Sequence, residues 1–168
     1  SHVVRHDYPM YVQSPDAELV AENTFDACEY LMRVQADGES GLETDFVGPV
    51  PTHITYYPAS HLRAHGEDQP TTDLLRLTGA TVRTVGADVG DTGWWGLRSG
   101  HEDIASSMAE RLAQAIAAAG ETGATTVVSD SVCASLAIAE QTGTLPLHPL
   151  QLVARAYGIA KDQPLDEA

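Results

Sequence analysis

The sequence contains few basic residues and few cysteines. Only 9 of its 168 residues are lysine or arginine, against 24 aspartates and glutamates, and the formal net charge is −15. Binding to nucleic acid needs a basic face that neutralises phosphates, so nucleic acid is not an expected partner. The two cysteines, Cys28 and Cys133, lie far apart in the chain and form no Cys-x-x-Cys pair, which argues against a disulfide framework.

Long apolar runs are also missing. No segment approaches the roughly 18 consecutive apolar residues of a membrane-spanning helix. Residues 1–6 contain neither the basic nor the apolar segment of a signal peptide. We therefore expect a cytoplasmic protein without a transmembrane segment, which is peripheral to a membrane only through its partners. The acidic residues are dispersed, which favours a solvated acidic surface over a disordered acidic tail.

Glycine and proline mark the organisation of the chain. Residues 36–52 carry three glycines and two prolines and form the clearest linker. They separate an N-terminal segment with a helix (residues 1–35), which resembles the end of a preceding domain, from an α/β domain (residues 53–160). Residues 161–168 form a short C-terminal tail. With 43% hydrophobic residues, the chain is long enough to bury a real core.

Strand-like and helix-like segments alternate in the α/β domain. The patterns predict strands at 53–57, 80–86 and 125–128, and helices at 71–79, 101–119 and 131–142, with a last helix after Pro149. Upstream, Ser14-Pro15-Asp16 predicts the start of a helix that runs to about Val34. This alternation predicts a three-layer α/β fold around a small, mostly parallel sheet of at least three strands, with right-handed βα crossovers.

Two further patterns predict the buried face of one helix and the place of a functional site. On the helix at 101–119, apolar residues recur every four positions and predict its buried face: Ile104, Met108, Leu112 and Ile116. The turns after the three strands, residues 58–66, 86–96 and 129–135, are rich in glycine, proline and small polar residues. Because the carboxyl ends of parallel strands share one edge, these turns should converge there, and any site is expected at that edge.

Four segments, in order, resemble the cysteine-rich (CCG) domain family: YYPASHLRAHG, WWGLRSGHEDIASSMAERL, TTVVSD and LPLHPLQLVARAYGI. This domain occurs in the C subunit of anaerobic glycerol-3-phosphate dehydrogenase and in the B subunit of heterodisulfide reductase. The resemblance covers nearly the whole chain and is closest to the second of the two tandem domains in the dehydrogenase subunit. It implies an electron-transfer subunit that carries an iron–sulfur cluster and works with a flavin-containing dehydrogenase.

The sequence departs from the family at the cluster ligands. The family has one cysteine before His-Leu-Arg, a Cys-Cys-Gly pair in the glycine-rich loop and a Cys-x-x-Cys after the third strand. The positions that match these ligands are Ser60, Asp88, Val89, Ser131 and Ala134. Cys133 lies one residue out of register, and one thiolate cannot hold a multi-iron cluster. We therefore expect that the iron–sulfur cluster is lost and that no cofactor is bound.

The first hypothesis for function is docking or assembly within a redox complex. A flavin dehydrogenase subunit would be the protein partner, and a homo-oligomer is left open. In this hypothesis Val89, Trp94, Trp95 and Ala134 fill the space that the cluster occupies in the family. Buried tryptophans supply large apolar contacts, which would offset the lost metal–ligand bonds.

The second hypothesis is a mononuclear zinc or iron site at the same edge. Imidazole and carboxylate ligands suit such a metal, and the candidates are His53, His61, His65, Asp88, Asp91, His101 and Cys133. Only His61 and His65 show a ligand-like spacing, and both fall in a predicted loop.

The third hypothesis is a small hydrolase. Ser131 or Ser60 would be its nucleophile, a nearby histidine its base and Asp130 the residue that orients the base. Against it, a serine at a helix start is far more often a cap. Cys133, also at this helix start, could be a reactive thiol, but an inert buried thiol is favoured.

Overall fold

The computed structural model describes residues 1–38, 41–86, 88–120 and 126–159. It divides the chain into two compact units, Ser1–Leu42 and Glu43–Ala168. The division between them lies inside residues 36–52. The tail predicted at 161–168 lies outside the described residues, as does the first residue of the strand predicted at 125–128.

The first unit consists of short helices: η1 (Val3–Asp7), α1 (Tyr8–Tyr11), α2 (Pro15–Glu22) and α3 (Ala27–Ala36). Ser14 caps α2, as predicted, because its Oγ accepts from the Ala17 N–H at 3.2 Å. The prediction of one helix from there to about Val34 is wrong. A new helix begins after Asp26, whose side chain accepts from the Cys28 N–H while Glu29 accepts from the Asp26 N–H. This reciprocal capping box satisfies the N–H groups of a separate helix start.

The second unit contains a three-stranded, all-parallel sheet. Its strands are β1 (His53–Tyr57), β2 (Thr81–Thr84) and β3 (Thr126–Ser129), in the order β2-β1-β3. Ile54 lies opposite Val82 on one side and Thr126 on the other. Leu147 extends the sheet beyond β3 through a parallel bridge with Val128. The predicted small parallel sheet is therefore confirmed.

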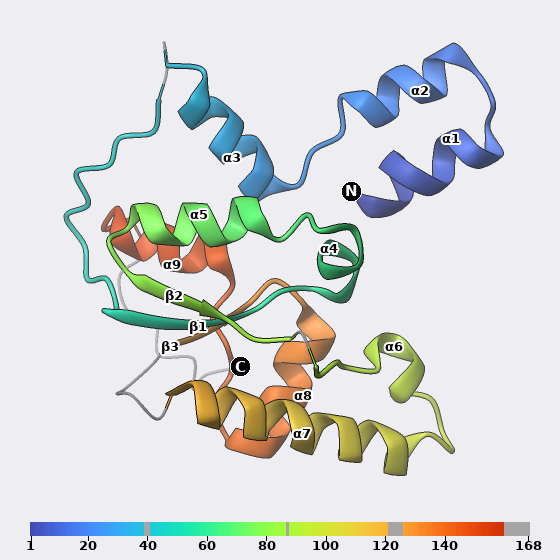
Figure 1. Ribbon diagram of the computed structural model, residues 1–168, viewed down its shortest axis with the longest axis vertical. Helices are drawn as coiled ribbons and strands as arrows, with labels where there is room; N and C mark the ends of the chain where they lie inside the picture. The colour runs from blue at the N-terminus through green and yellow to red at the C-terminus, as the bar shows by residue number, and fades with distance from the viewer. Residues whose placement is uncertain (39–40, 87, 121–125, 160–168) are drawn as a thin grey trace. The chain divides into compact units, whose positions relative to one another are not determined.

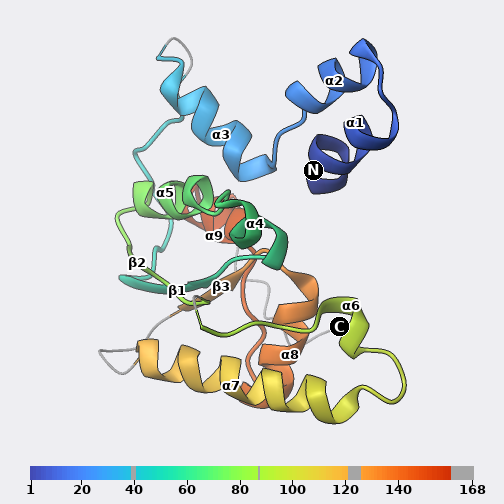
Figure 2. The ribbon, with the colours of Figure 1, turned by 45° about the vertical axis from the view of Figure 1, so that its right-hand side comes forward.

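Helices cover both faces of this sheet (Figures 1 and 2). α5 (Gln69–Leu77) and α9 (Pro149–Ala156) pack on one face, and α7 (Glu102–Gly120) and α8 (Val132–Thr142) pack on the other. This is the three-layer α/β fold that the alternation predicts. Two short helices, α4 (Ser60–His65) and α6 (Gly93–Gly96), lie in the segments that follow β1 and β2. Among the described residues, none of the helices combines the length and apolar character that crossing a bilayer requires.

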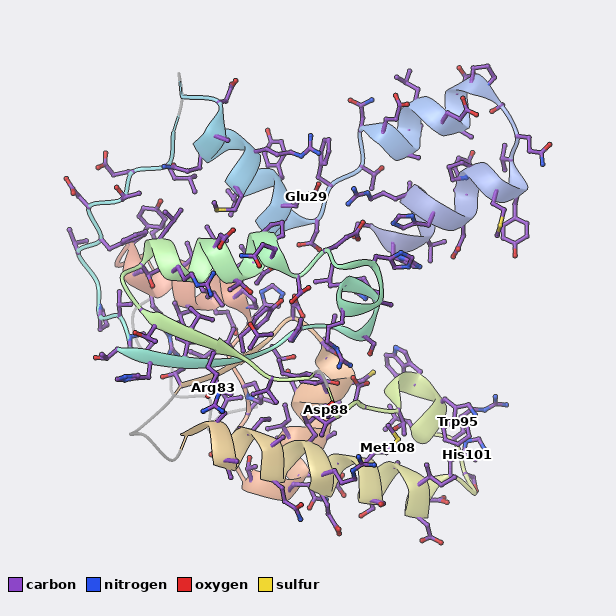
Figure 3. The ribbon with its side chains drawn as sticks, viewed as in Figure 1. Glu29, Arg83, Asp88, Trp95, His101 and Met108 are labelled. Atoms are coloured by element: carbon purple, nitrogen blue, oxygen red, sulfur yellow. The ribbon has the colours of Figure 1, made fainter. Side chains whose placement is uncertain are left out.

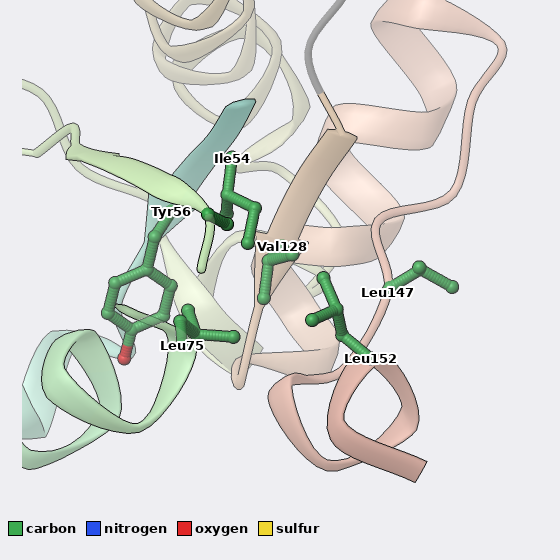
Figure 4. Close-up of a cluster of buried hydrophobic side chains, with 7 residues drawn as sticks. Ile54, Tyr56, Leu75, Val128, Leu147 and Leu152 are labelled. Atoms are coloured by element: carbon green, nitrogen blue, oxygen red, sulfur yellow. The ribbon is translucent and has the colours of Figure 1, made fainter. Parts of the chain in front are cut away.

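A separate apolar cluster stabilises each face. One comprises Ile54, Tyr56, Leu75, Ala80, Val128, Leu147 and Leu152 (Figure 4); the other comprises Tyr57, Leu112, Ile116, Ala134 and Ile138. Because side chains alternate along a strand, the neighbours Tyr56 and Tyr57 enter opposite clusters. Each is fully buried, and β1 therefore joins the two halves of the core.

The predicted apolar face of α7 is only partly buried. Leu112 and Ile116 lie in the core, whereas Ile104 is 52% exposed. The reason is visible in Figure 1: the first turns of α7 extend past the edge of the sheet, and only the later turns lie beneath it. The period of four residues identifies a face of the helix, but the length of the sheet decides how much of that face is covered.

This difference gives a matched pair of variants on one helix. Ile116→Ala should lower the free energy of unfolding by ~2–5 kcal/mol, because it leaves a cavity in the core. Ile104→Ala should change it by less than about 1 kcal/mol, because the side chain is mostly solvated. Urea denaturation measures both values. Equal losses for the two variants would show that the first turns of α7 are buried in solution.

Candidate functional site

The loops after the three strands meet at the carboxyl edge of the sheet. Asp130, which follows β3, accepts a hydrogen bond from the Tyr56 hydroxyl of β1 at 2.7 Å. Its other carboxylate oxygen accepts from the Ala59 N–H at 2.6 Å. One carboxylate thus connects the end of β3 to the end of β1 and to the residue that precedes α4. The predicted convergence of these loops is confirmed.

Asp91 makes the corresponding connection from the loop after β2. Its Oδ2 accepts from the Tyr57 hydroxyl at 2.9 Å and from the Ser60 hydroxyl at 3.1 Å. Its Oδ1 accepts from the Gly93 N–H at 2.8 Å, which shapes the start of α6. This half-buried carboxylate therefore joins β1, the first residue of α4 and its own loop. Short charge-assisted hydrogen bonds of this kind are stronger than neutral ones.

Arg63 completes the set of contacts from α4. Its Nη1 donates to the carbonyls of Gly86 and Val89, and its Nη2 donates to the Tyr57 hydroxyl at 2.9 Å. The guanidinium carbon also lies over the Tyr57 ring, 4.8 Å from its centre. Gly86 has φ +135°, and a Cβ there would meet Arg63, so this position requires glycine. We call the side chains of Tyr56, Tyr57, Ser60, Arg63, Asp91 and Asp130 the edge network.

The edge network shifts two ionisation equilibria. Burial, and then the charge of Asp91, raise the pKa of Tyr57 far above its ordinary value, against a smaller opposing effect of Arg63. The phenol therefore stays protonated and acts as a donor to Asp91. Burial, and then the charge of Asp91, also raise the pKa of Cys133. A raised pKa disfavours the thiolate, which favours an inert thiol over a reactive one at the half-buried Cys133.

The five positions that match the family's cluster ligands serve other purposes. Ser60 donates to Asp91, and Ser131 caps α8 by accepting from the Ala134 N–H at 3.2 Å. Ala134 is fully buried, and Val89 packs against its cluster. Asp88 is exposed. The only thiol among the described residues here is Cys133, and hydroxyl, methyl and isopropyl groups are not ligands for an iron–sulfur cluster. The residues present do not fit that group.

The tryptophans do not fill the space that the resemblance assigned to them. Trp94 is 75% exposed and Trp95 is 46% exposed, so the expectation that they are interior is wrong. The Trp95 ring stacks on His101 at 3.7 Å between ring centres, and His101 Nδ1 lies 2.8 Å from the Trp95 carbonyl (Figure 3). The reason is local: Gly96 of α6 is buried against Thr92 and Ala105, so the backbone of α6 packs inward and its rings point outward.

The residues proposed for a mononuclear metal site are dispersed. His53 begins β1, at the opposite end of the strand from the edge network, and His101 pairs with Trp95. His61 and His65 lie on α4, which is a helix and not the predicted loop. Within the described residues, no three of the seven candidates bring donor atoms within 4.8 Å of one another. Asp91 and Cys133 do line the same cavity.

The serine and the aspartate of the hydrolase hypothesis both take part in bonds that shape this corner of the sheet. Ser131 Oγ is used as the cap of α8, and the Asp130 carboxylate accepts from Tyr56 and from the Ala59 N–H. These two residues therefore hold the corner of the sheet together. His148, further along the chain, caps α9: its Nδ1 accepts from the Leu150 N–H at 3.2 Å.

A cavity that the sequence did not indicate lies beside the edge network. It has a volume of about 370 Å³. It is lined by residues of the segment 91–97 and of α7 and α8: Asp91, Thr92, Gly93, Gly96, Leu97, Glu102, Ala105, Ser106, Ala109, Cys133, Leu136, Ala137 and Glu140. We call it the α6–α8 groove. The residues that α7 and α8 contribute are mainly alanines and glutamates of ordinary helices, and no sequence signal distinguishes them.

The effect of Asp91 on Cys133 can be measured by alkylation. Asp91→Asn removes a negative charge and should lower the pKa of Cys133, so that the reaction with iodoacetamide at neutral pH is roughly two- to tenfold faster. Cys28 is buried, so the label should locate to Cys133 by peptide mass. Asp88→Asn, in the same loop, should leave the rate unchanged. A faster rate with an unchanged midpoint of the pH–rate profile would indicate exposure instead and contradict the charge effect.

Comparison of this chain with family models, with curated proteins and with solved structures gives no match in any of the three. The likeness to the CCG family therefore depends on the four quoted segments, and the function has to be argued from the edge network and the surface beside it.

Proposed function

We propose that this protein is a CCG-type domain without an iron–sulfur cluster, which acts by docking in a redox complex. Its contribution to such a complex is assembly and not the transfer of electrons. The partner is the flavin-containing dehydrogenase subunit that the family resemblance implies. The protein acts in the cytoplasm and reaches a membrane only through this partner.

The side chains at the carboxyl edge of the sheet support the proposal that this domain needs no iron–sulfur cluster. In the family, thiolates from three loops meet at one cluster. Here the corresponding loops are connected by carboxylates and a guanidinium: Asp130 joins β3 to β1, and Asp91 and Arg63 join α4 to the loop after β2. Val89 and Ala134 add apolar packing at former ligand positions. The fold can therefore close this edge with its own side chains.

The observation that carries the docking role is the exposed apolar surface of the segment around α6. Trp94 is 75% exposed and Leu97 is 60% exposed, next to the partly exposed Trp95. Large apolar side chains that gather on a surface mark interaction sites, and tryptophan is strongly enriched among the residues that dominate binding energies. This segment follows β2, the strand whose loop carries the Cys-Cys-Gly pair in the resembling family.

Metal analysis tests the first half of the proposal. Protein purified without oxygen should be colourless and should contain neither iron nor acid-labile sulfide in stoichiometric amounts, because a cluster needs several thiolates. A brown sample with both elements would refute the cluster-free assignment. Stoichiometric zinc would instead favour the mononuclear metal site of the second hypothesis.

Recovery of flavin tests the second half. Tagged protein isolated from the cells that produce it naturally should bring flavin with it, measured by fluorescence after release from the flavoprotein. Trp94→Ala should lower the recovered flavin by about tenfold or more, because truncating a central interface tryptophan commonly costs ~2 kcal/mol or more.

The control is Ile159→Ala, which truncates a side chain that is 76% exposed at a distant position of the sequence. It should leave the recovery of flavin unchanged. The proposal fails if the unmodified protein recovers no flavin, or if the two variants recover equal amounts. Both substitutions are at exposed positions, so folding should be retained, and circular dichroism checks this.

A further inference from the structure

We propose that the α6–α8 groove receives one arginine side chain that the partner protein presents. This inference rests on the proposed docking function and identifies the chemistry of the contact. None of the five positions that match the family's cluster ligands lines this groove.

The shape and the composition of the groove suit a long side chain with a charged end. Its wall is formed by small and apolar residues of two helices, including Ala105, Ala109 and Leu136. Leu136 is 51% exposed although it lies on a helix that packs against the sheet. An arginine has an aliphatic stem that packs against such a wall, while its guanidinium stays at a polar rim.

The charges of the groove select a cation. Asp91, Glu102 and Glu140 are among its lining residues, from three different segments, and no lysine or arginine lines it. Asp91 is already an acceptor for Tyr57 and Ser60, and Glu102 accepts from the Gly100 N–H at 2.8 Å. Glu140 lies exposed on α8. The net charge of −15 also attracts cationic groups over longer distances at low salt.

The arrangement favours an organic cation over a metal ion. A metal requires several donor atoms at one point, and within the described residues the three carboxylates and Cys133 do not form a group of three with donors within 4.8 Å. Dispersed carboxylates around an apolar wall match a guanidinium better, because this group is planar, weakly hydrated and offers five donors. Arginine is also enriched, with tryptophan, in the residues that dominate interfaces.

The position of the groove links it to the docking surface. Gly93, Gly96 and Leu97 line the groove, and the same short segment carries the exposed Trp94 and Trp95. Figure 3 shows Trp95 of α6 beside His101, which directly precedes α7, with Met108 further along α7. A partner seated on the tryptophans could thus place a neighbouring arginine in the groove. Aromatic anchors beside a charged pocket are a common interface design.

The test uses a synthetic probe because the partner's sequence is not needed for it. The peptide acetyl-Leu-Arg-Leu-amide is titrated into isotopically labelled protein, and amide shifts are followed by NMR. The shifts should locate to residues 91–97 and to the facing turns of α7 and α8. The same peptide with citrulline, which is neutral and nearly isosteric with arginine, should bind about three- to tenfold more weakly. The difference should shrink as salt is added.

A matched pair of variants locates the charge. Glu140→Gln should weaken the arginine peptide about threefold or more and leave the citrulline peptide unaffected. Glu110→Gln, an exposed glutamate of α7 that does not line the groove, should change neither. Both are surface substitutions, so both proteins should fold. Asp91 is not used as a variant, because it belongs to the edge network.

The outcomes separate this inference from the proposed function. Equal binding of the two peptides, shifts elsewhere on the protein, or equal effects of Glu140→Gln and Glu110→Gln would overturn the arginine site. If flavin recovery is lost in Trp94→Ala but unchanged in Glu140→Gln, docking stands and the groove has no part in it. If the peptide binds as expected while Trp94→Ala has no effect on flavin, the arginine site stands and the docking role is wrong. A lysine peptide that binds more tightly than the arginine peptide would also contradict the inference.

Discussion

Two carboxylates hold together the edge of the sheet on which the other features depend. Asp130 connects β3 to β1, and Asp91 connects β1 and α4 to the loop after β2. Parallel strands bring their carboxyl ends to one edge, but they do not by themselves fix the loops that leave that edge. The side-chain bonds do so here, with Arg63 as the cation that holds the Gly86 and Val89 carbonyls. Tyr57, Ser60, Asp91 and Asp130 all have hydrogen-bond partners in this network, and among its buried side-chain polar atoms the described residues leave Arg63 Nε without one.

This arrangement explains how the CCG-type domain that we propose can close this edge of the sheet without thiolates. A metal cluster and a hydrogen-bond network can both connect three loops, but they require different residues. The network needs acceptors of fixed geometry, such as Asp91, and hydroxyl donors, such as Ser60 and Tyr57. It also disfavours a thiolate nearby: the same Asp91 charge that accepts these bonds raises the pKa of Cys133. The edge is therefore suited to structure and poorly suited to soft-metal chemistry.

The surface next to this edge has a different character. The backbone of α6 packs inward through Gly96, which leaves Trp94 and Trp95 outside and opens a groove toward α7 and α8. Gly96 faces inward while Trp94 and Trp95 face outward on this single turn of helix, and large apolar side chains that gather on a surface mark interaction sites. The acidic rim of the groove adds charge selectivity to this apolar surface. The docking role that we propose would use both of these properties.

The sequence by itself determined the layers of the fold. Its alternation of strand and helix patterns predicted the parallel sheet, and the shared edge of parallel strands predicted that the turns at 58–66, 86–96 and 129–135 meet. It also identified Ser131 as a helix cap, because capping depends on local bonds. The sequence did not predict the helix break or the short helix. Asp26 starts a new helix inside a continuous helical pattern, and α4 forms where glycine and proline suggested a loop.

Only the tertiary structure decided which side chains work together. The sequence does not distinguish Asp91 from the other acidic residue of its loop. The fold places it beside Tyr57 and Ser60, which are more than 30 positions away in the sequence. Trp94 and Trp95 are large apolar residues of the kind that the sequence places in a core. Only the packing of Gly96 turned them outward. The groove is formed where the segment 91–97 meets α7 and α8, and no local sequence pattern shows that these three segments come together. Contacts between distant segments depend on how elements pack, and a local pattern contains no information about its packing partner.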